Sequence, residues 1–229
     1  MAQSKQAPDI LTFIKERLPH IRRSDAPYVD EHDPALKNLE IEIKPLCFDD
    51  SDSPGDDGEI LSEPLPFSSM SDLVEEKEPW ATPGGVMTVS RHLPPDGCVA
   101  WLTSKSRRWK VEKWIDNPRS PEPCLACFVS EESDLEEQQL SMSVVQITLV
   151  FTFYRLCQEK FKQHRSVPIT IVSASGLRVR IHRASFKLLG GCKGHIFVQK
   201  SPIMNLAKVQ GPISDDMIHI LRWMAGSSL

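Results

Sequence analysis

Cys124 and Cys127 are separated by Leu-Ala, and this spacing is the sharpest chemical motif in the chain. A CxxC pair can supply half of a zinc site or form a redox dithiol. A structural zinc site needs four ligands, yet the chain has no second CxxC, and His92 and Cys98 lie upstream at no familiar spacing. A redox pair would precede a helix, whereas Cys124 opens the strand-like run Cys-Leu-Ala-Cys-Phe-Val. We therefore expect idle thiols, with a zinc site or redox chemistry as the alternatives.

A second candidate combines cations with aromatic rings. Its members are Lys105, Arg107, Arg108, Trp109, Lys110, Lys113 and Trp114. Cations that neutralise phosphates and rings that stack on bases are what single-strand nucleic-acid binding uses. In a regular strand, however, Trp109 and Trp114 lie on opposite faces, because their positions differ by an odd number. The pattern favours core-packed tryptophans beside solvated cations, and the alternatives are binding of nucleic acid or of an acidic protein segment.

A third candidate is a basic strand face. Arg178, Arg180 and His182 alternate with three apolar residues, so their side chains share one face of the predicted strand. The simplest interpretation is a solvated sheet face. The functional interpretation is a face that binds anions.

The most available anion is the chain's own acidic segment, residues 25–83. From Asp25 to Trp80 it holds 17 acidic and 3 basic residues, a net charge of −14. The residues before it carry 5 basic and 2 acidic groups (+3), and residues 81–229 carry 19 and 12 (+7). Exposed ion pairs contribute about 1 kcal/mol or less each, so several could hold the segment weakly until salt releases it. We hypothesise that the acidic segment docks on the basic sheet face as an autoinhibitory contact.

The chain divides into three predicted parts: a short basic helix within residues 1–24, the acidic segment, and a single α+β domain over residues 84–229. The helix begins near Pro8 and ends at Pro19. Eight of the 18 prolines lie in residues 25–83, which predicts a mostly disordered segment. The alternation of Leu39-Glu-Ile-Glu-Ile-Lys predicts one strand there, over 39–44.

The domain opens with four predicted strands, over 86–90, 98–103, 109–115 and 124–129. Ser133 and Glu136 match a capping box, which predicts a long helix over 133–161. Strands over 169–173, 177–183 and 195–199 follow, and a last helix begins at Ser214. The predicted fold class is α+β, an antiparallel sheet with one long and one short C-terminal helix, preceded by a largely disordered acidic segment.

The C-terminal stretch resembles uncharacterised proteins of filamentous fungi. The resemblance is carried by Phe153-Tyr-Arg-Leu-Cys, Pro168-Ile-Thr-Ile-Val-Ser-Ala-Ser-Gly, Lys200-Ser-Pro-Ile and Leu221-Arg-Trp-Met-Ala. It covers about 80 residues, has unspecific motifs and implies no activity.

Composition and runs of apolar residues indicate a compartment. The longest apolar run, Val144–Tyr154, is shorter than the about 20 residues that a membrane span needs. The N-terminus has no apolar secretory core, and the six cysteines follow no disulfide framework. We expect an intracellular protein, cytoplasmic or nuclear, that contacts no membrane.

No catalytic constellation with a specific spacing is present. The chain has no Gly-x-Ser-x-Gly elbow and no HExxH helix, and Gly190-Gly-Cys-Lys-Gly lacks the phosphate-loop spacing. The sequence favours a non-enzymatic protein-interaction or regulatory factor with a protein partner and no cofactor. The first alternative is a nucleic-acid-binding module using Lys105–Trp114 and Arg178–Arg183. The second is a zinc or redox protein centred on Cys124 and Cys127.

Overall fold

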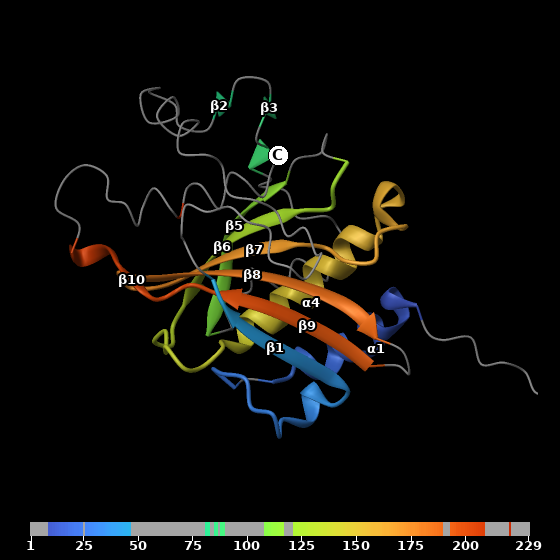
Figure 1. Cartoon of the computed structure of the whole chain (residues 1–229), viewed down its shortest axis with the longest axis horizontal. Coiled ribbons are helices and arrows are strands. Elements are labelled where there is room, and N and C mark those ends of the chain that lie inside the picture. Colours follow the sequence, from blue (N-terminus) through green and yellow to red (C-terminus); the bar gives the residue numbers. More distant parts are fainter. Residues whose placement is uncertain are drawn as a thin grey trace, which may run out of the picture.

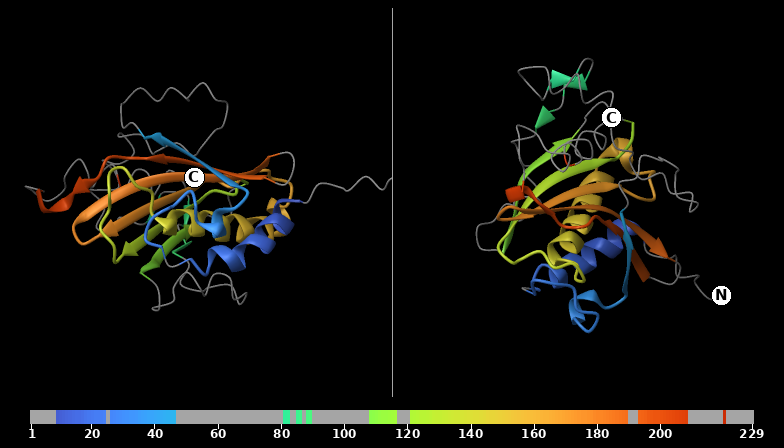
Figure 2. Two further views of the ribbon diagram at one scale, coloured as in Figure 1. Left: turned by 90° about the horizontal axis from the view of Figure 1, so that it is seen from below. Right: turned by 60° about the vertical axis from the view of Figure 1, so that its left-hand side comes forward.

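The computed structural model describes residues 9–24, 26–46, 81–82, 85–86, 88–89, 108–116, 121–189, 193–208 and 220. One large β-sheet carries two helices on one of its faces (Figures 1 and 2). The helices are α1 (Ile10–Ile21) and α4 (Met142–Leu156), and short 3-10 turns are η1 (Pro34–Leu36), η3 (Glu159–Phe161) and η4 (Leu206–Lys208). The strands are β1 (Leu39–Pro45), β2 (Ala81–Thr82), β3 (Gly85–Val86), β4 (Thr88–Val89), β5 (Trp109–Asp116), β6 (Leu125–Glu131), β7 (Ile169–Ser175), β8 (Arg178–Leu189), β9 (Lys193–Lys200) and β10 (Met204–Asn205).

The large sheet has the strand order β1-β9-β8-β7-β6-β5-β4, with β10 paired to β8 beside this path. Two neighbouring pairs are parallel, β1 with β9 and β6 with β7. The other pairs of this sheet are antiparallel. β6 and β7 run parallel because α4 connects them as a crossover that returns the chain to the starting end of the sheet. β2 and β3 pair separately.

The predicted antiparallel sheet with two C-terminal helices is wrong. The sheet is mixed, α1 precedes every strand, and β7 to β10 follow α4. Alternation of apolar and charged residues predicts strands but contains no information on strand direction, which here depends on the α4 crossover and on the parallel addition of β1. The coarser prediction, helices combined with a sheet, is confirmed. The predicted strand over 98–103 and the last helix, apart from Ile220, lie outside the described residues.

Helix α4 is shorter than the sequence predicts. It begins at Met142 with Ser141 as N-cap and ends at Leu156. The capping box that begins at Ser133 is not used, and the residues from 132 to 140 form an irregular connection instead. Nearly every side chain of α4 is buried, polar ones included, because the helix lies between the sheet and α1 and has almost no solvent-facing side.

Helix α1 packs on α4 and on the edge of the sheet. Phe13, Ile14, Leu18 and Ile21 form its buried side. The prediction that the helix ends at Pro19 is wrong, because a proline in the last turn removes only one N–H donor and the helix continues to Ile21. The two helices are tied together by Gln146, whose Nε2 donates to the Ile21 carbonyl oxygen at 2.7 Å.

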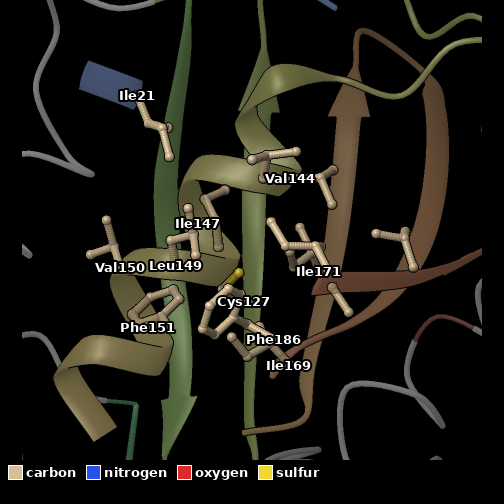
Figure 3. Packing of buried hydrophobic residues seen from close by; sticks show 14 of the residues in the cluster. Ile21, Cys127, Val144, Ile147, Leu149, Val150, Phe151, Ile169, Ile171 and Phe186 are labelled. Carbon is tan, nitrogen blue, oxygen red and sulfur yellow. The ribbon is translucent and has the colours of Figure 1, made fainter. Parts of the chain in front are cut away.

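The main apolar core lies between the helices and the sheet. Figure 3 shows Ile147 and Phe151 of α4 beside Cys127 of β6. Gly194 of β9 is required here, because a Cβ at this position would lie 2.6 Å from Phe186 and 2.7 Å from Phe13. A smaller cluster covers the opposite face of the sheet, around Val172, Ile181 and neighbouring residues, and includes Ile220. The core thus fixes the middle of the sheet. Buried polar side chains lie at the end of the sheet that contains Glu131 of β6 and Arg180 of β8, hereafter the polar end.

Candidate anion-binding site

The polar end of the sheet is closed by the connection between β6 and α4, residues 132–141, hereafter the 132–141 loop. Leu135 and Leu140 anchor this loop in the interior, with 3% and 2% of their surface exposed. Residues 136–139 between them are exposed. The loop therefore presents one polar segment, fixed at both ends by leucines, to the neighbouring strands.

Arg180 of β8 is the centre of the contacts that this loop makes. Its side chain is 2% exposed and forms an ion pair with the carboxylate of Glu137, which is 55% exposed. Its Nη1 donates to the Glu136 carbonyl oxygen at 2.7 Å, and its Nε donates to the Ser201 carbonyl oxygen at 3.0 Å. A buried guanidinium is stable only with such partners, because its desolvation costs several kcal/mol, on the order estimated for a buried ion.

Glu137 has further partners at the end of β9 and in the connection from β9 to β10. The backbone N–H of Ile203 donates to Glu137 Oε1 at 3.1 Å, and Lys200 Nζ donates to the Glu137 carbonyl oxygen at 2.8 Å. Burial lowers the pKa of Lys200, nearby Arg180 lowers it further, and Glu137 opposes the shift. Two cations and one backbone N–H thus contact one glutamate. Arg180 and the Ile203 N–H bind its carboxylate, and Lys200 binds its carbonyl oxygen.

A second carboxyl group lies on the same side of the sheet, at the end of β6. Glu131 is 9% exposed, and Ser143 donates a short hydrogen bond to its Oε1. Burial raises the pKa of Glu131 to about 7, although hydrogen bonds from Ser143, Ser141 and Ser173 oppose the shift. Near neutral pH this carboxyl group is therefore protonated in part of the molecules, whereas a solvated glutamate is fully ionised.

His182 lies two residues beyond Arg180 on β8 and is 1% exposed. Burial lowers its pKa to about 3, and the charges of Arg180 and Lys200 add to that shift. Its ring is therefore neutral at physiological pH and cannot bind an anion as a cation. Within the described residues its Nδ1 has no hydrogen-bond partner.

The structure thus places the basic face differently from the simplest interpretation of the sequence. Arg178, Arg180 and His182 do share a face, opposite Val179 and Ile181, which pack in the smaller cluster. That face is not solvated, since Arg180 and His182 are both buried, Arg180 against the 132–141 loop, and only Arg178 is partly exposed. Sequence reasoning missed the partners: Glu136-Glu137 was assigned to a helix, and no local pattern marks Lys200 or the Ile203 N–H.

The basic and aromatic strand β5 is arranged otherwise. The register of β5 against β6 shifts between Val111 and Lys113, and this bulge turns Trp109 and Trp114 to the same, helix-covered face. The two rings are 7% and 5% exposed, so they form part of the core and offer no stacking platform. The expectation that they face opposite sides is wrong.

The cations of β5 are at the surface. Lys110 Nζ lies 2.7 Å from Glu112 Oε2, and Ser130 Oγ donates to Glu112 Oε1 at 2.8 Å. Arg108 and Lys113 are exposed. Lys105 and Arg107 lie outside the described residues. This strand keeps part of the predicted basic surface without the aromatic part.

Of the cysteine pair, Cys127 lies on β6 and Cys124 directly precedes this strand. Burial raises the pKa of both thiols, Cys127 being fully buried and Cys124 partly so. Three steps along an extended strand span about 10 Å, beyond the roughly 7 Å that a disulfide bridges, and the odd spacing directs the side chains to opposite faces. In the described part of the chain no three His, Cys, Asp or Glu side chains gather as a metal site would require.

No family model, curated protein or solved structure matches the chain. Among the described helices, none combines the length and the apolar character that crossing a membrane would need.

Proposed function

We propose that this protein is a non-enzymatic interaction or regulatory factor that recognises acidic polypeptide segments. The observation that carries the proposal is the set of contacts around Glu137. Residues at the predicted basic face bind an acidic peptide segment through its carboxylate and through its main chain. That segment belongs to the chain itself.

Among the described residues, the side chains that could perform chemistry support a non-enzymatic role. The Cys127 thiol is buried and protonated, and the His182 ring is buried and neutral. A nucleophile needs a lowered pKa or a base in contact with it, and a general base needs a pKa near the working pH. Glu131 has such a pKa, but hydrogen bonds to serines and burial enclose its carboxyl group.

The acidic segment contributes to the fold as well as to charge. Its residues Leu39–Pro45 are β1, the edge strand beside β9. Docking of the remainder on the basic sheet face stays a prediction. Because Glu137 already occupies Arg180, such docking at Arg180 would have to displace the 132–141 loop.

The test is affinity purification of the full-length chain from lysate of its source, with and without nuclease. We expect a set of proteins that stays bound after nuclease treatment and elutes as salt rises. Salt weakens exposed ion pairs because it shortens the screening length, which is about 10 Å at 0.1 M salt. A matched variant replaces the acidic residues between Asp49 and Glu59 with their amides. It keeps β1, which deletion of residues 25–80 would destroy.

Loss of all bound material on nuclease treatment would overturn the proposal. It would favour a nucleic-acid-binding protein that uses the exposed cations of β5. Unchanged capture by the amide variant would show that residues 49–59 do not take part, and the proposal would then rest on the Arg180 site alone.

A further inference from the structure

We propose that Arg180, Lys200 and the backbone N–H of Ile203 form a peptide-binding site that Glu137 fills in cis, and that an acidic segment of a partner protein takes its place. The identity of the ligand as a protein segment rests on the proposed function. The site itself rests on the contacts around Glu137.

The contacts define the chemistry of the ligand. Arg180 and the Ile203 N–H donate to the carboxylate of Glu137. Arg180 also donates to the carbonyl oxygen of the preceding residue, and Lys200 donates to the carbonyl oxygen of Glu137 itself. The four donors therefore bind one acidic side chain and two consecutive main-chain carbonyls, a pattern that a short acidic peptide can reproduce and a free small anion cannot.

The loop can release the site without unfolding the core. Leu135 and Leu140 hold its two ends in the interior, whereas residues 136–139 are exposed and Glu137 itself is 55% exposed. Glu136 and Glu137 are held by hydrogen bonds from Arg180, Lys200 and the backbone N–H of Ile203. Exchange of this segment for a similar one therefore breaks and remakes the same kind of bond.

The need of the buried cation for a partner makes the vacated site attractive to a ligand. A guanidinium that is 2% exposed cannot be left without an anion at low cost. In the intact protein Glu137 competes at the high effective concentration of a tethered ligand, so binding in trans should be weak. Removing the Glu137 carboxylate should expose the full affinity.

The experiment uses the full-length protein carrying Glu137→Ala, with Glu136→Ala as the matched control. Both variants lose one acidic group from the same exposed segment, but only Glu137→Ala removes the carboxylate from the site, because Arg180 contacts Glu136 through its carbonyl oxygen. The probe is a synthetic peptide with the sequence of residues 132–141. A second peptide replaces the Glu137 position with alanine, and sodium acetate serves as the carboxylate alone.

We expect the first peptide to bind the Glu137→Ala protein at least tenfold more tightly than it binds the wild type or the Glu136→Ala protein. It should also raise the Tm of Glu137→Ala. The alanine-substituted peptide should do neither. If Glu137→Ala fails to fold, Glu137→Gln keeps the shape and removes only the charge.

Equal affinity of the peptide for all three proteins would overturn the inference. Acetate that restores the Tm of Glu137→Ala as well as the peptide does would also overturn it, because the site would then recognise a carboxylate and not a peptide. Neither result would alter nuclease-resistant capture of proteins by the wild type. The failure of this inference and the failure of the proposed function are therefore distinguishable.

Discussion

Strands β5 and β8 both contain basic and apolar residues, but their basic side chains differ in exposure to solvent. In both strands, basic and apolar residues are interspersed along the chain. β5 lies near one edge of the sheet, where the described residues of β4 pair with it at two positions, whereas β8 lies inside the sheet between β7 and β9. Lys110 and Lys113 of β5 are at the surface, while Arg180 of β8 is buried. Lys110 and Lys113 lie on the face of the sheet opposite the helices, whereas Arg180 lies on the helix-covered face. The face of the sheet thus decides whether a cation is solvated or buried.

The apolar residues of the two strands show the complementary difference. The bulge in β5 brings Trp109 and Trp114 to the helix-covered face, where the Trp114 ring lies 6.4 Å from that of Phe151 between centroids. β8 keeps regular pairing with β7, and its even-numbered residues are covered by α4 at one end and by the 132–141 loop at the other. The tryptophans on β5 are therefore structural, and Arg180 at the polar end of β8 is occupied by Glu137 of the 132–141 loop.

The largest expected effect tests the structural role of the β5 tryptophans. Trp114→Ala should lower the free energy of unfolding by about 3–5 kcal/mol, the usual loss when a buried Trp is truncated. Lys113→Ala, one residue away and exposed, should change it by less than about 0.5 kcal/mol. Urea denaturation followed by far-UV circular dichroism measures both. A small loss for Trp114→Ala would place the ring at the surface and restore the stacking platform to the nucleic-acid alternative.

The sequence alone predicts the local pattern of these strands but not their surroundings. Alternation locates β1 and the first half of β8, because an extended chain places every second side chain on one face. It does not predict that β8 continues to Leu189. It cannot locate the bulge at β5, since the extra residue is defined by the partner strand. It also cannot connect Arg180 with Glu137, which lies 43 residues away along the chain. The sequence predicts that Arg178, Arg180 and His182 share a face, but the loop that contacts Arg180 depends on the tertiary fold.

The next effect concerns the buried carboxyl group at the polar end. The folded pKa of Glu131 is about 7, above its ordinary value of 4.5. Its contribution to stability is therefore fully present below about pH 4.5 and is lost as pH rises through about 7, because the unfolded chain releases the proton first. The loss approaches about 3 kcal/mol for a shift of this size. Glu131→Gln cannot ionise and should avoid it.

The measurement for Glu131 is the difference in free energy of unfolding between Glu131→Gln and the wild type at several pH values. The difference should be small near pH 5 and should grow in favour of the variant up to pH 8. Taking a difference removes the opposite contribution of His182, whose lowered pKa adds stability as pH rises. A difference independent of pH would show that Glu131 is ionised throughout.

A smaller effect compares the cations of the two strands directly. Arg180→Met removes hydrogen bonds to the carbonyl oxygens of Glu136 and Ser201 and the ion pair to Glu137. Each hydrogen bond of a charged group contributes about 1.5–3 kcal/mol, but methionine removes the desolvation cost of the buried cation and restores part of the packing. We therefore expect a net loss of about 2–3 kcal/mol. Lys110→Met on β5 should lose less than about 1 kcal/mol. Equal losses in urea denaturation would mean that the two cations are equally solvated.

The smallest effect is the pH dependence of Glu112, which should have the opposite sign to that of Glu131. Hydrogen bonds from Lys110 and Ser130 lower the pKa of Glu112, because they favour its charged form. Its contribution is present above the ordinary pKa of a glutamate and is lost as pH falls through the lowered folded value. The carboxylate is 37% exposed, so screening by water should keep the contribution below about 1 kcal/mol.

Glu112→Gln should therefore be less stable than the wild type at pH 7, and the difference should shrink as pH falls below the ordinary pKa of a glutamate. Added salt should reduce the difference at pH 7. Glu131→Gln should become more stable than the wild type as pH rises from about 4.5 through about 7. This difference should respond little to salt, because the carboxyl group is buried. Opposite signs for the two glutamates in one series of urea denaturations would establish that the β5 surface is solvated while the polar end of the sheet is not. The same sign for both would contradict that difference.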